Sequence, residues 1–105
     1  CTPTATADLA AQLALLIETR AWGTYHATSA GRCAWSAFAA EIFRLAAARG
    51  LIAAAPAVTA ITSAEFGALA RRPAYSVLEN RALADLGIER MRPWQEALAG
   101  YIASL

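Results

Sequence analysis

Two adjacent arginines, Arg71 and Arg72, are the residues of this sequence best suited to binding a charged ligand. A guanidinium can donate two parallel hydrogen bonds to a phosphate or a carboxylate, so a pair of them suits an anion. Pro73 follows and restricts the backbone, and a β-prone run from Tyr75 to Leu78 comes next. This pattern predicts an anion-binding loop, and a solvated pair of charges at the end of a loop is the alternative.

The other side chains with reactive chemistry are few and scattered. His26 is the only histidine, and the sequence fixes no acid or thiol beside it, so we expect a hydrogen-bonded histidine in a buried strand. Cys1 and Cys33 stand far apart and, with a single histidine, make no metal-ligand cluster. We expect both to be free thiols in a reducing cytosol, and therefore a cytoplasmic protein.

None of the common catalytic motifs occurs in the chain. The six glycines are scattered and do not fit the G-x-G-x-x-G fingerprint, and there is no G-x-S-x-G elbow. All nine basic residues are arginine, so this chain cannot supply a catalytic lysine. The acids are dispersed, and the sequence places no pair of them for acid–base work. We therefore expect no catalytic, cofactor-binding or metal-binding residue here.

Composition indicates one small, helix-rich domain over residues 1–105. The apolar fraction is 58%, but 29 residues are alanine, which favours helices more than it adds to a core. No apolar run approaches the length of a membrane span, and a net charge of +1 suggests neither a nucleic-acid nor a membrane partner. The first residues lack a signal-peptide pattern and a methionine, which suggests a chain that begins inside a longer protein.

Apolar periodicity predicts four helices and one additional helical turn. In the first helix, for example, Leu9, Leu13 and Leu16 recur at helical spacing. Trp35 and Phe38 begin the apolar stripe of the second helix and are expected in the core. The helices are expected over residues 6–20, 35–49, 80–86 and 94–104, with the short turn starting at Thr62.

Capping residues mark several of these helix ends. Thr62 and Glu65 have the spacing of a capping box, and Asn80 can cap the helix that follows it. Gly50 and Gly87 can adopt the left-handed conformation that ends a helix. These signals are local, so they predict where helices begin and end without reference to the rest of the fold.

Two short β-prone runs, residues 24–28 and 57–61, are predicted to be strands. A helix lies between them, and the order strand, helix, strand favours a parallel pair with a right-handed crossover. The expected fold class is therefore α/β, in the form of a small helix-rich lobe with a short parallel strand pair.

Five short motifs occur in an order typical of one enzyme family. The longest, residues 70–80, is ARRPAYSVLEN. The other four are PT and DLA within residues 3–10, GTYH at 23–26, a tryptophan-containing helix within residues 31–43, and WQEAL at 94–98. Together they resemble the dTDP-4-dehydrorhamnose reductases, whose matching segment is A-R-R-P-x-x-S-x-L-D-N. The resemblance covers nearly the whole chain.

This resemblance implies a fold and a function for a longer protein. The family belongs to the extended short-chain dehydrogenase/reductases, in which an N-terminal Rossmann domain binds NADPH and provides a catalytic Tyr-x-x-x-Lys. A smaller C-terminal lobe closes over the nucleotide-sugar. The family reduces the 4-keto group of dTDP-4-dehydro-L-rhamnose to give dTDP-L-rhamnose, a polysaccharide precursor. The chain resembles the C-terminal lobe only, without the Rossmann domain.

The resemblance also implies which residues bind the substrate. Arg71, Arg72 and Tyr75 are the expected dTDP-sugar contacts, with at least one arginine on the diphosphate or the nucleotide. NADPH is expected to bind the Rossmann domain, so this chain alone should be inactive. A lobe without its partner domain should expose an apolar face, and we expect the protein to be a homodimer.

Several positions, including Glu79 in place of an aspartate, depart from the family pattern, and two other functions remain open. Ala34 and Ala37 replace a serine and a glutamate, so no capping box is expected at the start of the second helix. Residues 67–69 replace a P-T-P run, so that loop should be less stiff. The alternatives are a regulatory homologue that binds a nucleotide-sugar without turnover, and an unrelated helical interaction domain.

Overall fold

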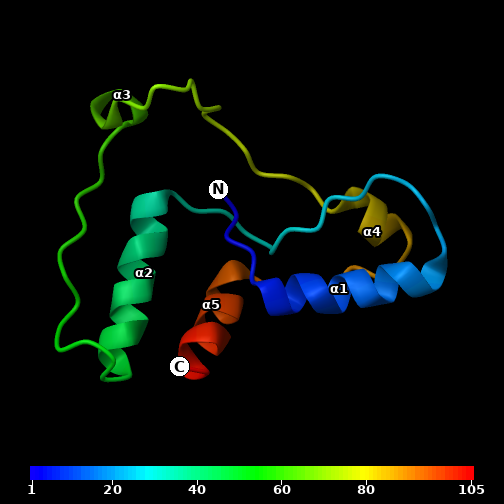
Figure 1. The fold of residues 1–105 in the computed structure, drawn as a ribbon, viewed down its shortest axis with the longest axis horizontal. Coiled ribbons are helices and arrows are strands. Elements are labelled where there is room, and N and C mark those ends of the chain that lie inside the picture. Colours follow the sequence, from blue (N-terminus) through cyan, green and yellow to red (C-terminus); the bar gives the residue numbers. More distant parts are fainter.

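A computed structural model describes residues 1–105 as five helices joined by irregular segments (Figure 1). The helices are α1 (Thr6–Thr19), α2 (Trp35–Ala48), α3 (Ser63–Phe66), α4 (Arg81–Asp85) and α5 (Trp94–Ala103). The four predicted helices and the predicted short turn are confirmed, with ends that differ by at most one residue. None of the five helices has the length and hydropathy needed to cross a bilayer.

Glycine motifs end α2 and α4 as expected. Gly50 has φ +70°, and Leu51 N–H donates to the carbonyl of Ala46 at 2.9 Å, five residues back. Gly87 has φ +72°, and Ile88 N–H closes the same kind of bond at 3.2 Å onto Leu83. These six-to-one bonds satisfy carbonyls that would otherwise lack a partner at the helix end.

The predicted helix starts are confirmed in two cases and wrong in one. Thr62 and Glu65 form the full capping box at α3. The start of α2, at Ala34, has no side-chain cap, as its alanine predicts. Asn80, by contrast, does not cap α4. Its side chain is occupied by Thr28 and Glu89, which lie elsewhere in the chain.

The predicted parallel strand pair is absent: neither β-prone run forms a strand. Residues 57–61 lie on an exposed segment, and residues 24–28 are irregular. The one β-type contact is an isolated parallel bridge between Ala30 and Pro93. A short β-prone run is stable as a strand only with a partner and a packed face. The chain is therefore a helical lobe without a sheet.

The core lies between α5 and α2, which run side by side (Figure 1). Trp94, Leu98 and Ile102 of α5 form its buried cluster. Phe38 of α2 meets Trp94 edge-to-face, with ring centroids 5.8 Å apart, a favourable aromatic geometry. The prediction that Trp35 also lies in the core is wrong: its side chain is 70% exposed.

Polar contacts attach α1 to the segment before α5. Gln12 is buried, and its amide donates to the carbonyl of Ile88 at 3.0 Å and accepts from the N–H of Arg90 at 2.7 Å. Asp8 pairs with Arg92 through two hydrogen bonds of 3.1 and 2.7 Å. Backbone groups that no strand pairs are satisfied in this way by side chains.

Residues 51–79, which we call the outer arm, follow the C-terminal end of α2, include α3 and lead to the start of α4 (Figure 1). No residue between Ala46 and Leu83 is buried. We call the remainder of the chain, residues 1–50 and 80–105, the inner body. The arginine pair lies on the outer arm, outside the packed part of the molecule.

Candidate functional site

The structure places the arginine pair in an irregular loop, which we call the arginine loop (residues 67–79). Arg71 and Arg72 are exposed, and neither guanidinium makes a hydrogen bond or an ion pair within the chain. Tyr75 is in the same loop and is 62% exposed. Because no carboxylate neutralises the pair, both guanidiniums are free to bind an anion.

Asn80 fixes the end of the arginine loop onto the inner body. Its Oδ1 accepts from the N–H of Thr28 at 2.9 Å, and its Nδ2 donates to the carbonyl of Thr28 at 2.6 Å. The same Nδ2 donates to Glu89 Oε1 at 3.2 Å. The Thr28 hydroxyl donates to the carbonyl of Leu78 at 3.4 Å. The amide thus pairs with the backbone of Thr28 in the way that a strand would.

Arg32, which the sequence did not single out, contacts the arginine loop. Its Nη1 lies 3.4 Å from the Tyr75 hydroxyl, to which it donates, and its Cζ lies 6.0 Å from the centroid of the Tyr75 ring. The two residues are 43 positions apart, so no spacing rule could pair them. A third arginine therefore contacts the loop that carries the two arginines identified from the sequence.

A cavity of about 270 Å³ lies beside the end of the arginine loop. It is lined by residues 28–31 and 77–81, together with Ala84 and Glu89. The Ser29 hydroxyl on this lining segment is buried and has no hydrogen-bond partner. Polar and apolar groups therefore both line the cavity, and it adjoins the loop on which the predicted ligand residues lie.

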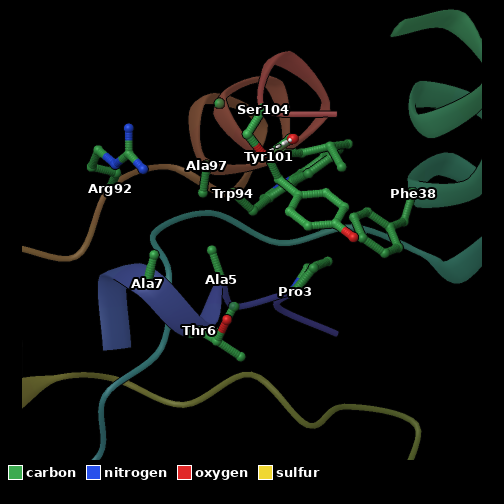
Figure 2. Close-up of a pocket in the computed structure, with 13 residues that line it drawn as sticks. Pro3, Ala5, Thr6, Ala7, Phe38, Arg92, Trp94, Ala97, Tyr101 and Ser104 are labelled. Atoms are coloured by element: carbon green, nitrogen blue, oxygen red, sulfur yellow. Dashed lines mark hydrogen bonds between the residues drawn. The ribbon is translucent and has the colours of Figure 1, made fainter. Parts of the chain in front are cut away.

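A larger cavity of about 480 Å³ lies between the N-terminal segment and α5 (Figure 2). Its walls include Pro3, Phe38, Trp94 and Tyr101. Arg92 at its edge is held by Asp8, whose hydrogen bonds raise the pKa of the guanidinium further. None of the three predicted ligand residues lines either cavity, and the one cation of each cavity, Arg92 or Arg81, is already paired with a carboxylate. The arginine loop itself, with its two unpaired guanidiniums, is therefore the candidate site for an anion.

The remaining sequence candidates do not join the arginine loop. His26 is exposed on an irregular segment and makes no hydrogen bond, so the expected buried strand histidine is wrong. Cys1 and Cys33 form no disulfide, although their backbones exchange hydrogen bonds of 2.9 and 3.0 Å. Burial raises the pKa of the Cys33 thiol, which makes it less reactive. The structure gathers no group of three or more histidine, cysteine or acidic side chains that could hold a metal ion.

The residues of this chain do not fit a dinucleotide cofactor. Such a cofactor needs glycines gathered in one turn at a helix N-terminus, so that the backbone can approach the pyrophosphate. Here Gly50, Gly67 and Gly87 each follow the C-terminal end of a different helix. Gly31 instead lies against Trp94, where an added Cβ would come within 3.2 Å of the indole.

Comparison with known proteins matches the whole chain to one family. Residues 1–105 match the family described as RmlD substrate binding domain. A dTDP-4-dehydrorhamnose reductase of Streptomyces griseus is 42% identical over 102 residues, covering 91% of this chain and 32% of the relative. The spore coat polysaccharide biosynthesis protein SpsK of Bacillus subtilis is 38% identical over 100 residues, covering 95% and 32%. The chain thus spans about a third of the length of these relatives.

Two solved structures have the same fold as the chain. A dTDP-4-dehydrorhamnose reductase from Clostridium acetobutylicum superposes with a TM-score of 0.87 at 41% identity, covering 98% of this chain and 35% of that one. The Bacillus anthracis dTDP-4-dehydrorhamnose reductase in complex with NADP gives 0.88 at 35% identity, covering 99% and 35%. The helical lobe described above therefore occurs as part of a longer chain in both structures.

Proposed function

Because the chain belongs to the RmlD substrate binding domain family, we propose that it is the substrate-binding lobe of an NADPH-dependent dTDP-4-dehydrorhamnose reductase. The full-length protein would reduce the 4-keto group of dTDP-4-dehydro-L-rhamnose to give dTDP-L-rhamnose in the cytoplasm. Relatives named for this reductase and for spore coat polysaccharide biosynthesis support the proposal. The match over the entire chain is the observation on which the proposal rests, and it argues against an unrelated helical interaction domain.

In this proposal, Arg71, Arg72 and Tyr75 bind the dTDP-sugar. Both guanidiniums lack a carboxylate partner in the structure, which supports a role in binding the diphosphate. The exposed ring of Tyr75 offers a surface for the nucleotide or the sugar. Binding and orienting the substrate is then the contribution of this lobe to the rate of the reaction.

The reductive chemistry is assigned to a Rossmann domain that this chain does not contain. NADPH supplies the hydride when it is bound, and the glycines here do not form a site for it. The chain also contains no lysine for a Tyr-x-x-x-Lys pair. The lobe on its own is therefore expected to consume no NADPH with any 4-keto nucleotide-sugar.

A homodimer is proposed for the full-length protein. Large apolar side chains are exposed on the inner body, including Ile17 at 65% and Trp22 at 85%. Exposed apolar surface of this kind favours burial against a partner domain or a second copy. Light scattering on the full-length protein tests this, and a monomer at high concentration would contradict it.

The experiment that tests the function uses the full-length protein. NADPH consumption with dTDP-4-dehydro-L-rhamnose is followed at the nicotinamide absorbance band. Replacing the substrate-binding arginine, Arg71→Ala or Arg72→Ala, should raise KM about 10- to 100-fold, because a charged hydrogen bond is lost. Arg44→Ala is the matched control, since Arg44 is an exposed arginine already paired with Glu41 on α2.

Three outcomes of this experiment are informative. Turnover with a raised KM in one arginine variant supports both the reaction and the site. Turnover with unchanged KM in both variants leaves Arg71 and Arg72 as surface charges. A folded protein that binds NADPH and the dTDP-sugar without turnover would instead indicate the non-catalytic regulatory homologue.

A further inference from the structure

Arg32 projects from a rigid part of the inner body. Ala30, two residues before it, donates its N–H to the carbonyl of Arg92 at 2.9 Å and accepts from the N–H of Trp94 at 3.1 Å. Gly31 has φ +85° and lies against the Trp94 indole. The backbone beside Arg32 is therefore fixed by hydrogen bonds to the start of α5, the helix that carries the buried cluster of Trp94, Leu98 and Ile102.

The side chain of Arg32 reaches across to the arginine loop. Its guanidinium lies near the face of the Tyr75 ring and donates to the Tyr75 hydroxyl at 3.4 Å. No carboxylate pairs with Arg32. The cation is therefore free to interact with the ring, whose π-face attracts it.

Along most of the arginine loop, the bond from Arg32 to Tyr75 is the only hydrogen bond. No other residue among 68–77 makes a backbone or a side-chain hydrogen bond. The next attachment is at Leu78, where the Thr28 hydroxyl donates, and Asn80 follows it. Residues 68–77, which include Arg71 and Arg72, are thus joined to the inner body by one hydrogen bond, the one that Arg32 donates to Tyr75.

We propose that Arg32 is a positioning residue, which holds Tyr75 and so presents Arg71 and Arg72 to the diphosphate of the nucleotide-sugar. The ligand in this inference rests on the proposed function, but the hold on the loop does not. Arg32 acts through Tyr75, so its loss should weaken binding without changing the chemical step. Fixing the loop before the ligand arrives reduces the ordering cost that binding would otherwise incur.

The hold on the loop is tested by limited trypsin digestion of the full-length protein without ligand. The bond after Arg71 is a trypsin site, and Pro73 protects the bond after Arg72. The Arg32→Ala variant should be cut after Arg71 about 3- to 10-fold faster, in proportion to the loop's increased opening. Arg44→Ala, which removes an equal charge on α2, should be cut at the wild-type rate. An unchanged rate in Arg32→Ala overturns the inference.

The route through Tyr75 is tested by titration with dTDP and by steady-state kinetics. Arg32→Ala should raise the Kd for dTDP and the KM for the sugar substrate about 3- to 10-fold, with kcat and the thermal midpoint unchanged. Arg32→Lys keeps a cation at the ring and should restore part of the affinity. In a Tyr75→Ala background, Arg32→Ala should have no further effect.

The failures of the two proposals are distinguishable. Equal losses of affinity in the wild-type and Tyr75→Ala backgrounds would mean that Arg32 contacts the ligand itself, which overturns the positioning role. If the wild-type protein does not bind dTDP, the proposed function fails. The trypsin comparison then decides the role of Arg32 by itself.

Discussion

The inner body and the outer arm of this lobe are built by different means. The inner body contains every buried residue, including the cluster of Trp94, Leu98 and Ile102. The outer arm contains none, and α3 at Ser63–Phe66 is its only helix. The candidate ligand residues Arg71 and Arg72 nevertheless lie on the arm. The packed inner body therefore supports an exposed segment that carries the candidate ligand residues, and a few polar contacts join the two. Ligand-binding residues of many proteins lie on exposed loops of this kind.

The largest expected effect comes from removing the centre of the core. Trp94→Ala in the full-length protein should lower the free energy of unfolding of the lobe by about 3–5 kcal/mol, because a buried aromatic side chain is lost and a cavity remains. Urea denaturation followed by circular dichroism measures this loss. Leu69→Ala on the outer arm is the control, since Leu69 is fully exposed, and it should change stability by no more than about 0.5 kcal/mol. Equal losses would contradict the division between body and arm.

The next effect concerns the junction between the two regions. Asn80→Ala removes the amide that pairs with Thr28 and Glu89, and should cost about 1–3 kcal/mol because partly buried backbone groups lose their partners. The same denaturation experiment measures it. The neighbouring exposed residue gives the control, Glu79→Ala, which should stay within about 0.5 kcal/mol of the wild type. A neutral Asn80→Ala would mean that the arm is held elsewhere.

The inner body's helices were predictable because their signals are local. Apolar spacing identified α1, α2 and α5, and the glycines at 50 and 87 marked the ends of α2 and α4. The strands failed because pairing depends on a neighbour that the sequence does not specify. The prediction that Asn80 caps α4 was wrong for a related reason. Its side chain hydrogen-bonds to Thr28, 52 residues away in the sequence, and not to the helix beside it.

Only part of the candidate site could be predicted from the sequence. Residue types alone identified Arg71 and Arg72, and the family resemblance added Tyr75. Arg32 was missed because its contact with Tyr75 spans 43 residues. No motif around Arg32 in the sequence indicates a binding residue. Packing of the inner body determines that contact, so only the three-dimensional structure could reveal it.

A smaller effect is expected within the outer arm, at the capping box of α3. Thr62→Ala removes the hydroxyl that accepts from the Glu65 N–H at 3.2 Å, and should reduce the local stability of this turn by about 0.5–2 kcal/mol. Global unfolding should not change, because no buried residue depends on α3. Amide chemical shifts of residues 62–66 report the local change. A matching loss in global stability would show that the arm is coupled to the core.

The smallest effect is the pH response of the same turn. The N–H of Thr62 donates to Glu65 Oε2 at 2.6 Å, and its hydroxyl donates at 2.8 Å, so both hold the pKa of Glu65 below its ordinary value. A lowered folded-state pKa favours the charged carboxylate. The turn is therefore fully stabilised above the ordinary glutamate pKa of about 4.3 and loses that stabilisation as the pH falls through the lower, folded-state value.

Two variants at Thr62 separate the two donors that act on Glu65. The backbone N–H is the larger cause of the shift, so Thr62→Ala should return the carboxyl pKa only part of the way. Thr62→Pro removes both donors, and the native φ of −78° suits proline, so here the pKa should return fully to its ordinary value. Carbon-detected NMR titration of the Glu65 carboxyl measures each midpoint. A titration that is the same in all three proteins would mean that the capping box is not formed in solution, and that the outer arm has even less structure of its own than its hydrogen bonds indicate.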